Sequence, residues 1–99
     1  MDSTSPKQQI ESLGAGVFIR SRNCESRLEE ADFHRAFSEP VIVWIMPGSF
    51  REDKMDALLD AAKKLHAVQR FRFPSVSVPV GLLDRIRREF PKSAVEGVK

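Results

Sequence analysis

The chain has 99 residues, a length that suits one domain, and 16 Lys and Arg against 14 Asp and Glu leave a net charge of +2. This charge is too small to imply nucleic acid by itself, and an apolar content of 41% excludes a chain that is disordered throughout. The single cysteine excludes an intramolecular disulfide and a zinc site built from several cysteines.

The first residues are polar and contain a proline, so we expect residues 1–9 to be a disordered tail and residues 10–99 to form a single α/β repeat-like domain. No stretch approaches the ~18–20 apolar residues that cross a membrane, and the start lacks the pattern of a secretory signal. A free thiol at Cys24 fits a reducing compartment. We therefore expect a cytoplasmic protein without a membrane partner.

The first predicted strand covers residues 17–20 and follows two glycines that are typical of a turn. Ser26 and Glu29 have the spacing of a capping box, which predicts a helix over 27–37. The clearest strand is 41–46, where six apolar residues lie between two prolines. A continuous apolar run of this kind favours a central strand.

Ser49 and Glu52 form a second capping box, and the apolar stripe behind it predicts a helix over 50–65. Alternating apolar and arginine residues predict a strand over 69–73, and Pro79 favours the start of a helix over 79–90. A short extended segment at Ala94 and Val95 ends the pattern.

This order, β-α-β-α-β-α, predicts an α/β fold in which a three-stranded, mainly parallel sheet carries its helices on one face and leaves the other face open. The predicted core consists of the apolar residues on the inner faces of these elements: Val17, Ile19, Leu28, Phe33, Phe37, Val43, Ile45, Met55, Leu58, Leu59, Ala62, Leu65, Val68, Phe71, Phe73, Leu83, Ile86 and Phe90.

Residues 65–95 resemble the end of a leucine-rich-repeat array of the variety with a helix in each repeat. The positions that carry the resemblance are Leu65, Val68, Phe71, Phe73, Val76, Val78, Leu83, Ile86 and the closing Phe90-Pro91-Lys92 with Val95. Residues 41–64 look like a degenerate earlier repeat, and 17–37 like a poorly matched third one. Most leucines are replaced by other apolar residues, and Val76 stands where the family has asparagine. The resemblance implies a binding scaffold and brings no catalytic residues with it.

A repeat of this kind exposes the strand residues that alternate with its leucine positions. We therefore predict a partner-binding face with an apolar centre and a basic rim, made of Ile42, Trp44, Met46, Arg20, Arg70 and Arg72. Trp and Arg are enriched at the energetic centres of protein interfaces. Trp44 is then partly exposed in the monomer, whereas a register slip of one residue would place it in the core.

The predicted function is that of a small non-catalytic protein-interaction module with a protein partner or self-association through the open sheet face. The sequence has no recognised catalytic or phosphate-binding motif, and we expect no cofactor or metal. The alternative is nucleic-acid or anion binding, because residues 65–99 have a net charge of +4 against −2 for residues 1–64. We expect Arg85, Arg87 and Arg88 to form a solvated helix face.

Overall fold

The computed structural model describes residues 6–21, 24–48 and 50–99. In chain order the elements are the helix α1 (Pro6–Ser12), the strands β1 (Ala15–Ser21) and β2 (Cys24–Arg27), the 3₁₀ helix η1 (Glu30–Phe37), β3 (Pro40–Ile45), α2 (Glu52–Ala62), β4 (Ala67–Val76), α3 (Val80–Glu89) and β5 (Ala94–Val98).

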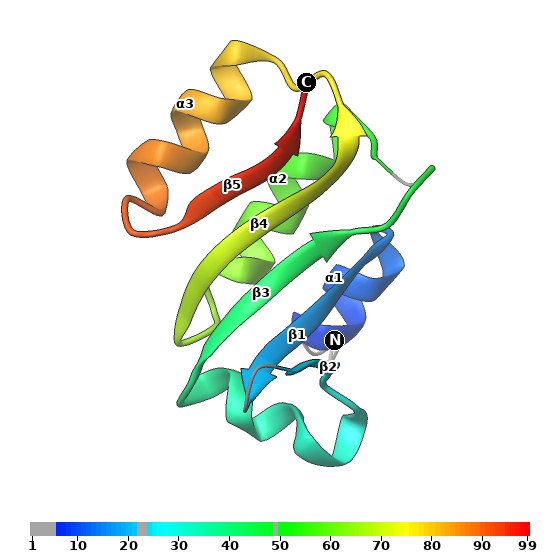
Figure 1. Ribbon diagram of the computed structural model, residues 1–99, viewed down its shortest axis with the longest axis vertical. Helices are drawn as coiled ribbons and strands as arrows, with labels where there is room; N and C mark the ends of the chain where they lie inside the picture. Colours follow the sequence, from blue (N-terminus) through cyan, green and yellow to red (C-terminus); the bar gives the residue numbers. More distant parts are fainter. Residues whose placement is uncertain (1–5, 22–23, 49) are drawn as a thin grey trace, which may run out of the picture.

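The strands form one mixed sheet in the order β2-β1-β3-β4-β5, with β3 at its centre (Figure 1). β3, β4 and β5 are parallel, so the predicted α/β class, the central position of 41–46 and its parallel pairing with 69–73 are confirmed. The predicted three-stranded, mainly parallel sheet is corrected to a mixed sheet of five strands, because 24–27 and 94–98 are also strands and β1 is antiparallel to both β2 and β3. Only two residues separate β1 from β2, a connection that joins antiparallel strands and is too short for a parallel crossover.

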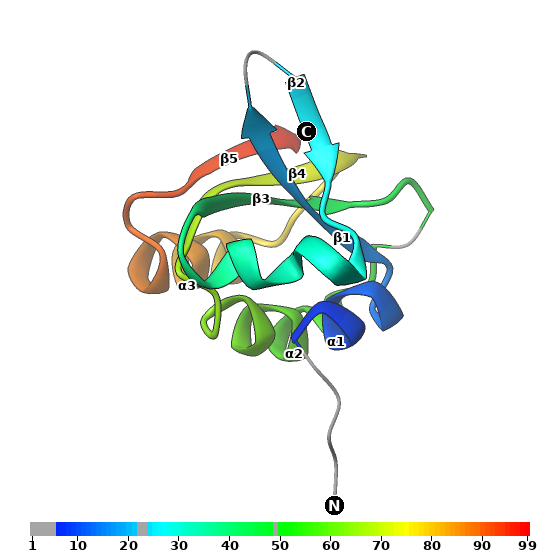
Figure 2. The same cartoon turned by 90° about the horizontal axis from the view of Figure 1, so that it is seen from below.

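The helices lie on one face of the sheet, as predicted, and no helix of the described residues covers the opposite face (Figure 2). The hairpin formed by β2 and the end of β1 rises above this open face. Residues 17–37 are therefore a hairpin followed by η1 rather than a third strand–helix unit. Two strand–helix units remain, β3–α2 and β4–α3, and β5 follows them as the last strand of the chain that the structure describes.

The apolar core lies between the sheet and the helices and contains nearly all of the predicted core residues. Leu83 and Phe90 are partly buried against it, and Phe37 is wrongly assigned because its side chain is 48% exposed. The reason is the type of helix: a 3₁₀ helix has three residues per turn, so it aligns Ala36 with Phe33 and turns Phe37 outward.

The N-terminal segment differs from the predicted tail, because residues 6–12 form α1 and Ile10 is fully buried in the core. Residues 1–5, the rest of that predicted tail, lie outside the described residues. A single buried side chain on a short polar helix gives no periodicity to detect, which is why the sequence did not predict α1.

Neither capping box starts a helix as predicted. Ser26 lies within β2, and η1 begins after Glu29 without a side-chain hydrogen bond to its first turn. Ser49 is outside the described residues, and α2 begins after Arg51, again without a side-chain cap. Pairing of 24–27 with β1 outweighs the local capping signal at Ser26.

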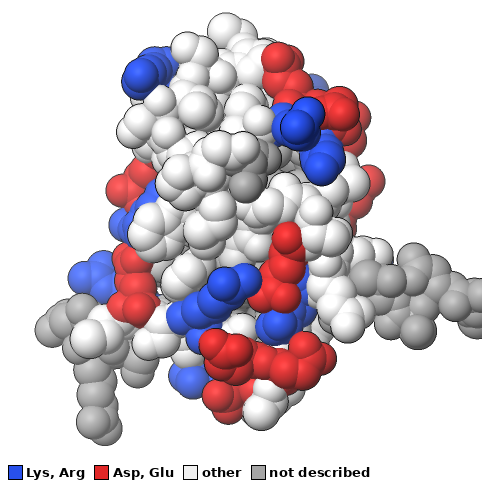
Figure 3. Space-filling view, turned by 90° about the vertical axis from the view of Figure 1, so that its right-hand side faces the viewer, with Lys and Arg blue, Asp and Glu red and all other residues white. Residues whose placement is uncertain are grey.

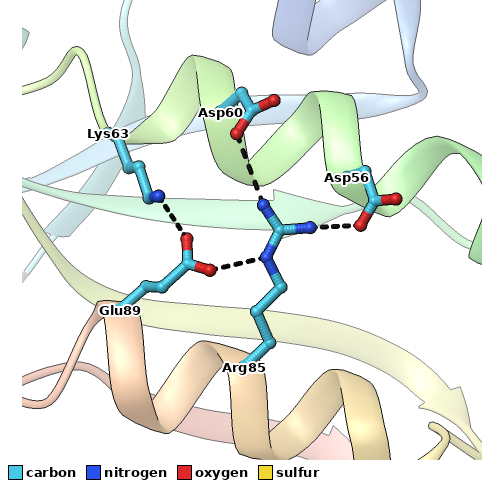
Figure 4. A network of polar contacts seen from close by, with 5 residues as sticks. All are labelled: Asp56, Asp60, Lys63, Arg85 and Glu89. Atoms are coloured by element: carbon cyan, nitrogen blue, oxygen red, sulfur yellow. Dashed lines mark hydrogen bonds and ion pairs between the residues drawn. The ribbon is translucent and has the colours of Figure 1, made fainter.

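A network of ion pairs joins α2 to α3 (Figure 4). The Arg85 guanidinium contacts the carboxylates of Asp56, Asp60 and Glu89, and Lys63 contacts the other oxygen of Glu89. Arg87 and Arg88 are exposed as predicted, but Arg85 is not part of a solvated face. Its side chain is only 22% exposed and bridges the two helices.

Replacing Glu89 with glutamine should reduce the free energy of unfolding by about 1 kcal/mol at neutral pH, the scale of a partly exposed ion-pair network. Lys63 and Arg85 hold the pKa of the Glu89 carboxyl below its ordinary value. Its contribution is therefore complete above that ordinary pKa and is lost as pH falls through the lowered one. Urea denaturation at several pH values should show the two proteins converging in acid; a difference that stays constant would contradict this role.

Candidate protein-interaction face

Strand register places the predicted face residues in two rows across the open side of the sheet. Gly16 on β1, Trp44 on β3, Arg72 on β4 and Glu96 on β5 form one row. Phe18, Ile42 and Arg70 form the next. Because side chains alternate between the two faces of a sheet, these residues point away from the core under α2 and α3.

Trp44 lies at the centre of this face and is partly exposed. The Phe18 ring packs against it with 5.3 Å between ring centroids, and the Arg72 guanidinium carbon lies 4.6 Å from the centroid of the indole. This distance is within the range of a cation–π interaction. At Gly16 an added Cβ would lie 3.0 Å from the Phe18 ring and 3.2 Å from the Met46 side chain, so the absence of a side chain leaves room for both.

The Arg72 guanidinium is held by two carboxylates from different parts of the chain. Glu25 accepts hydrogen bonds from Nη1 and Nη2 of Arg72 at 2.7 and 3.0 Å, and Glu96 lies 3.5 Å from Nη2. The bidentate contact lowers the pKa of the Glu25 carboxyl and raises the pKa of Arg72. Arg72 is thereby fixed in one orientation over the indole.

Close approach of β5 to β4 brings Glu96 to this site. Gly97 has φ +76°, a conformation that favours glycine, and a Cβ there would overlap the backbone carbonyl of Phe73. The carboxylate of Glu96, the residue before Gly97 in β5, lies 3.0 Å from Nε of Arg70. Both arginines of β4 are thus paired with carboxylates.

The structure brings together most of the predicted face. Trp44, Met46, Arg70 and Arg72 are partly exposed and Arg20 is exposed on the hairpin. The remaining predicted residue, Ile42, is corrected: it lies on this face between Phe18 and Arg70 in register, but only 1% of it is exposed. A partner cannot contact Ile42 without displacing its neighbours.

Sequence reasoning missed Glu25 and Glu96, which neutralise part of the basic rim. Glu96 alternates with Val95 in the last strand, a weak signal that a longer predicted strand would have revealed. Glu25 had no such signal, since its partner is 47 residues away.

The rest of the described surface offers weaker candidates for a binding site than the open sheet face. A hollow of about 320 Å³ lies between α1 and α2, away from the open face. No group of three or more potential metal ligands occurs among the described residues, and within them no helix is long and apolar enough to cross a membrane. Figure 3 shows the side of the molecule that is at the right in Figure 1. Basic and acidic side chains form mixed clusters there, and uncharged surface separates the clusters.

The chain matches no family model, no curated protein and no solved structure.

Proposed function

We propose that this protein is a non-catalytic interaction module whose open sheet face binds a protein segment with apolar and acidic side chains. The observation that carries the proposal is the stack of Arg72 on the partly exposed Trp44, on a sheet face that no helix in the described part of the chain covers. Phe18 extends the apolar surface beside the indole. Trp and Arg supply much of the energy at interface centres because they combine large contact areas with directed polar groups.

The rigidity of the site supports binding rather than chemistry. Strand backbones position Trp44 and Arg72, and the Phe18 ring and the Arg72 guanidinium already pack on the indole, so few rotamers are lost when a partner docks. The lowered pKa values of Glu11, Glu25, Glu39 and Glu89 each accompany an ion pair with lysine or arginine. Ion pairing within the fold accounts for these shifts without a catalytic role.

We further propose that residues 41–95 are a degenerate pair of leucine-rich-repeat-type units. Support comes from the parallel succession of β3, α2, β4, α3 and β5, and from Phe71 and Phe73, which are buried under the sheet at positions that the resemblance assigns to leucines. In such a repeat the residues that alternate with those positions bind the ligand, and here they are Arg70 and Arg72.

Nucleic-acid or anion binding is the alternative, and the arginines of the face are its main support. Two of them, Arg70 and Arg72, are paired with Glu96 and Glu25, so their charge is already balanced within the fold. A phosphate backbone that uses both arginines would need to displace both carboxylates, whereas a protein segment with one acidic side chain would displace only Glu25 and can also use the apolar surface.

Site-specific photo-cross-linking in source lysate tests the proposal. One variant carries a photoreactive amino acid in place of Arg20 at the edge of the open face, and a matched variant carries it in place of Arg88 on α3. We expect a discrete cross-linked protein, or a second copy of this chain, from position 20 and none from position 88. Cross-linking to nucleic acid from position 20, or equal protein products from both positions, would contradict the proposal.

A further inference from the structure

Glu25 reaches Arg72 from an unexpected direction. Its backbone pairs with Arg20 on β1, whereas Arg72 belongs to β4, with β1 and β3 between the two strands. The carboxylate reaches the guanidinium because the β1–β2 hairpin rises over the open face (Figure 2). The hairpin therefore covers one side of the Trp44–Arg72 stack.

The contact occupies the donors that an acidic partner would use. Both terminal nitrogens of Arg72 donate to the two oxygens of Glu25, the geometry in which guanidinium binds a carboxylate most strongly. The guanidinium that binds this carboxylate lies over the Trp44 indole, with Phe18 beside the indole. This arrangement defines the chemistry that the site accepts.

The hairpin is attached so that it can move without opening the sheet. Among the described residues, β1 pairs with β3 only from Ala15 to Phe18, and the next residue, Ile19, is anchored in the core, so the hairpin beyond Ile19 is the part that can move. All four residues of β2 are exposed. The Glu25 and Arg72 side chains are 27% and 20% exposed, and ion pairs in contact with water contribute little free energy.

We propose that Glu25 is an internal competitor for an acidic side chain of the partner, and that the β1–β2 hairpin lifts from Trp44 when the partner binds. The inference rests on the proposed function and specifies its partner: a segment whose glutamate or aspartate takes the place of Glu25 on Arg72 while flanking apolar side chains contact Trp44 and Phe18.

The first test measures the hairpin itself through Trp44, the only tryptophan of the chain. Glu25→Gln removes the charge that holds the hairpin, so the emission of Trp44 should shift to the red and acrylamide should quench it more strongly. Glu39→Gln is the matched control, because it removes the same charge from an ion pair with Arg35 beside η1. Equal quenching of Glu25→Gln, Glu39→Gln and the wild type would overturn the inference.

The second test measures competition with a short synthetic peptide that alternates glutamate with leucine. We expect Glu25→Gln to bind this peptide up to about fivefold more tightly than the wild type or Glu39→Gln, the factor set by the loss of one partly exposed ion pair. For the same peptide with glutamine in place of glutamate, Glu25→Gln and the wild type should have equal affinity.

The outcomes separate the two proposals. Equal affinity of wild type and Glu25→Gln, together with loss of binding in Arg72→Gln, would overturn the competitor role and leave the binding face intact. Binding that is absent from all variants, or that Arg72→Gln does not weaken, would overturn the proposed function and this inference with it.

Discussion

Replacing Phe71 with alanine should lower the free energy of unfolding by about 3–5 kcal/mol, the range for a large aromatic side chain removed from a packed core. Phe71 is fully buried in the middle of β4, and its ring meets Phe90 edge-to-face with 5.0 Å between centroids. The substitution removes this contact and leaves a cavity that strands on both sides keep from collapsing. Chemical denaturation of the purified variant measures the loss.

Phe37→Ala is the matched control, because it makes the same change at a side chain that is 48% exposed. Within the described part of the chain its ring packs against that of Phe33, and much of its surface is in water, so we expect a loss below about 1 kcal/mol. Similar losses at the two positions, or a loss below 0.5 kcal/mol at Phe71, would show that the core is misassigned.

Replacing Trp44 with alanine should weaken binding of the glutamate–leucine peptide by more than about thirtyfold, which corresponds to about 2 kcal/mol at an interface centre. The indole is the surface on which Arg72 stacks and against which Phe18 packs, so its loss removes apolar contact and releases the guanidinium. Titration calorimetry measures the affinity.

The same variant should cost less stability than Phe71→Ala, since Trp44 keeps part of its surface in water. Unchanged peptide affinity would remove Trp44 from the site. A larger stability loss than Phe71→Ala would identify it as a structural residue.

Periodicity predicted the parts of the fold in which local sequence and tertiary packing agree. The apolar stripe on α2 and the alternation along 70–73 indicate which side of each element is buried. The residues on the other side of these strands were then predicted to lie on the open face. These segments carry Trp44 and both arginines of β4, so the sequence predicted that these residues lie on the open sheet face.

The other parts depend on contacts that a local pattern does not contain. The antiparallel direction of β1 follows from its pairing with β2 and β3. Ser26 lies in β2 and pairs with β1, although its spacing to Glu29 favours a helix cap. Glu25 is a site residue only because the hairpin folds over the sheet. Long-range electrostatic partners of this kind have no signature in a single sequence.

The most direct test of the open face as the binding surface compares capture from source lysate on three immobilised proteins: wild type, Trp44→Ala and Arg88→Ala. Arg88 is exposed on α3, so its replacement changes the surface without touching the open face. We predict that the same protein is recovered by wild type and Arg88→Ala and is lost with Trp44→Ala. Recovery of that protein by Trp44→Ala, or recovery of nucleic acid by all three, would contradict the assignment of this face as a protein-binding surface.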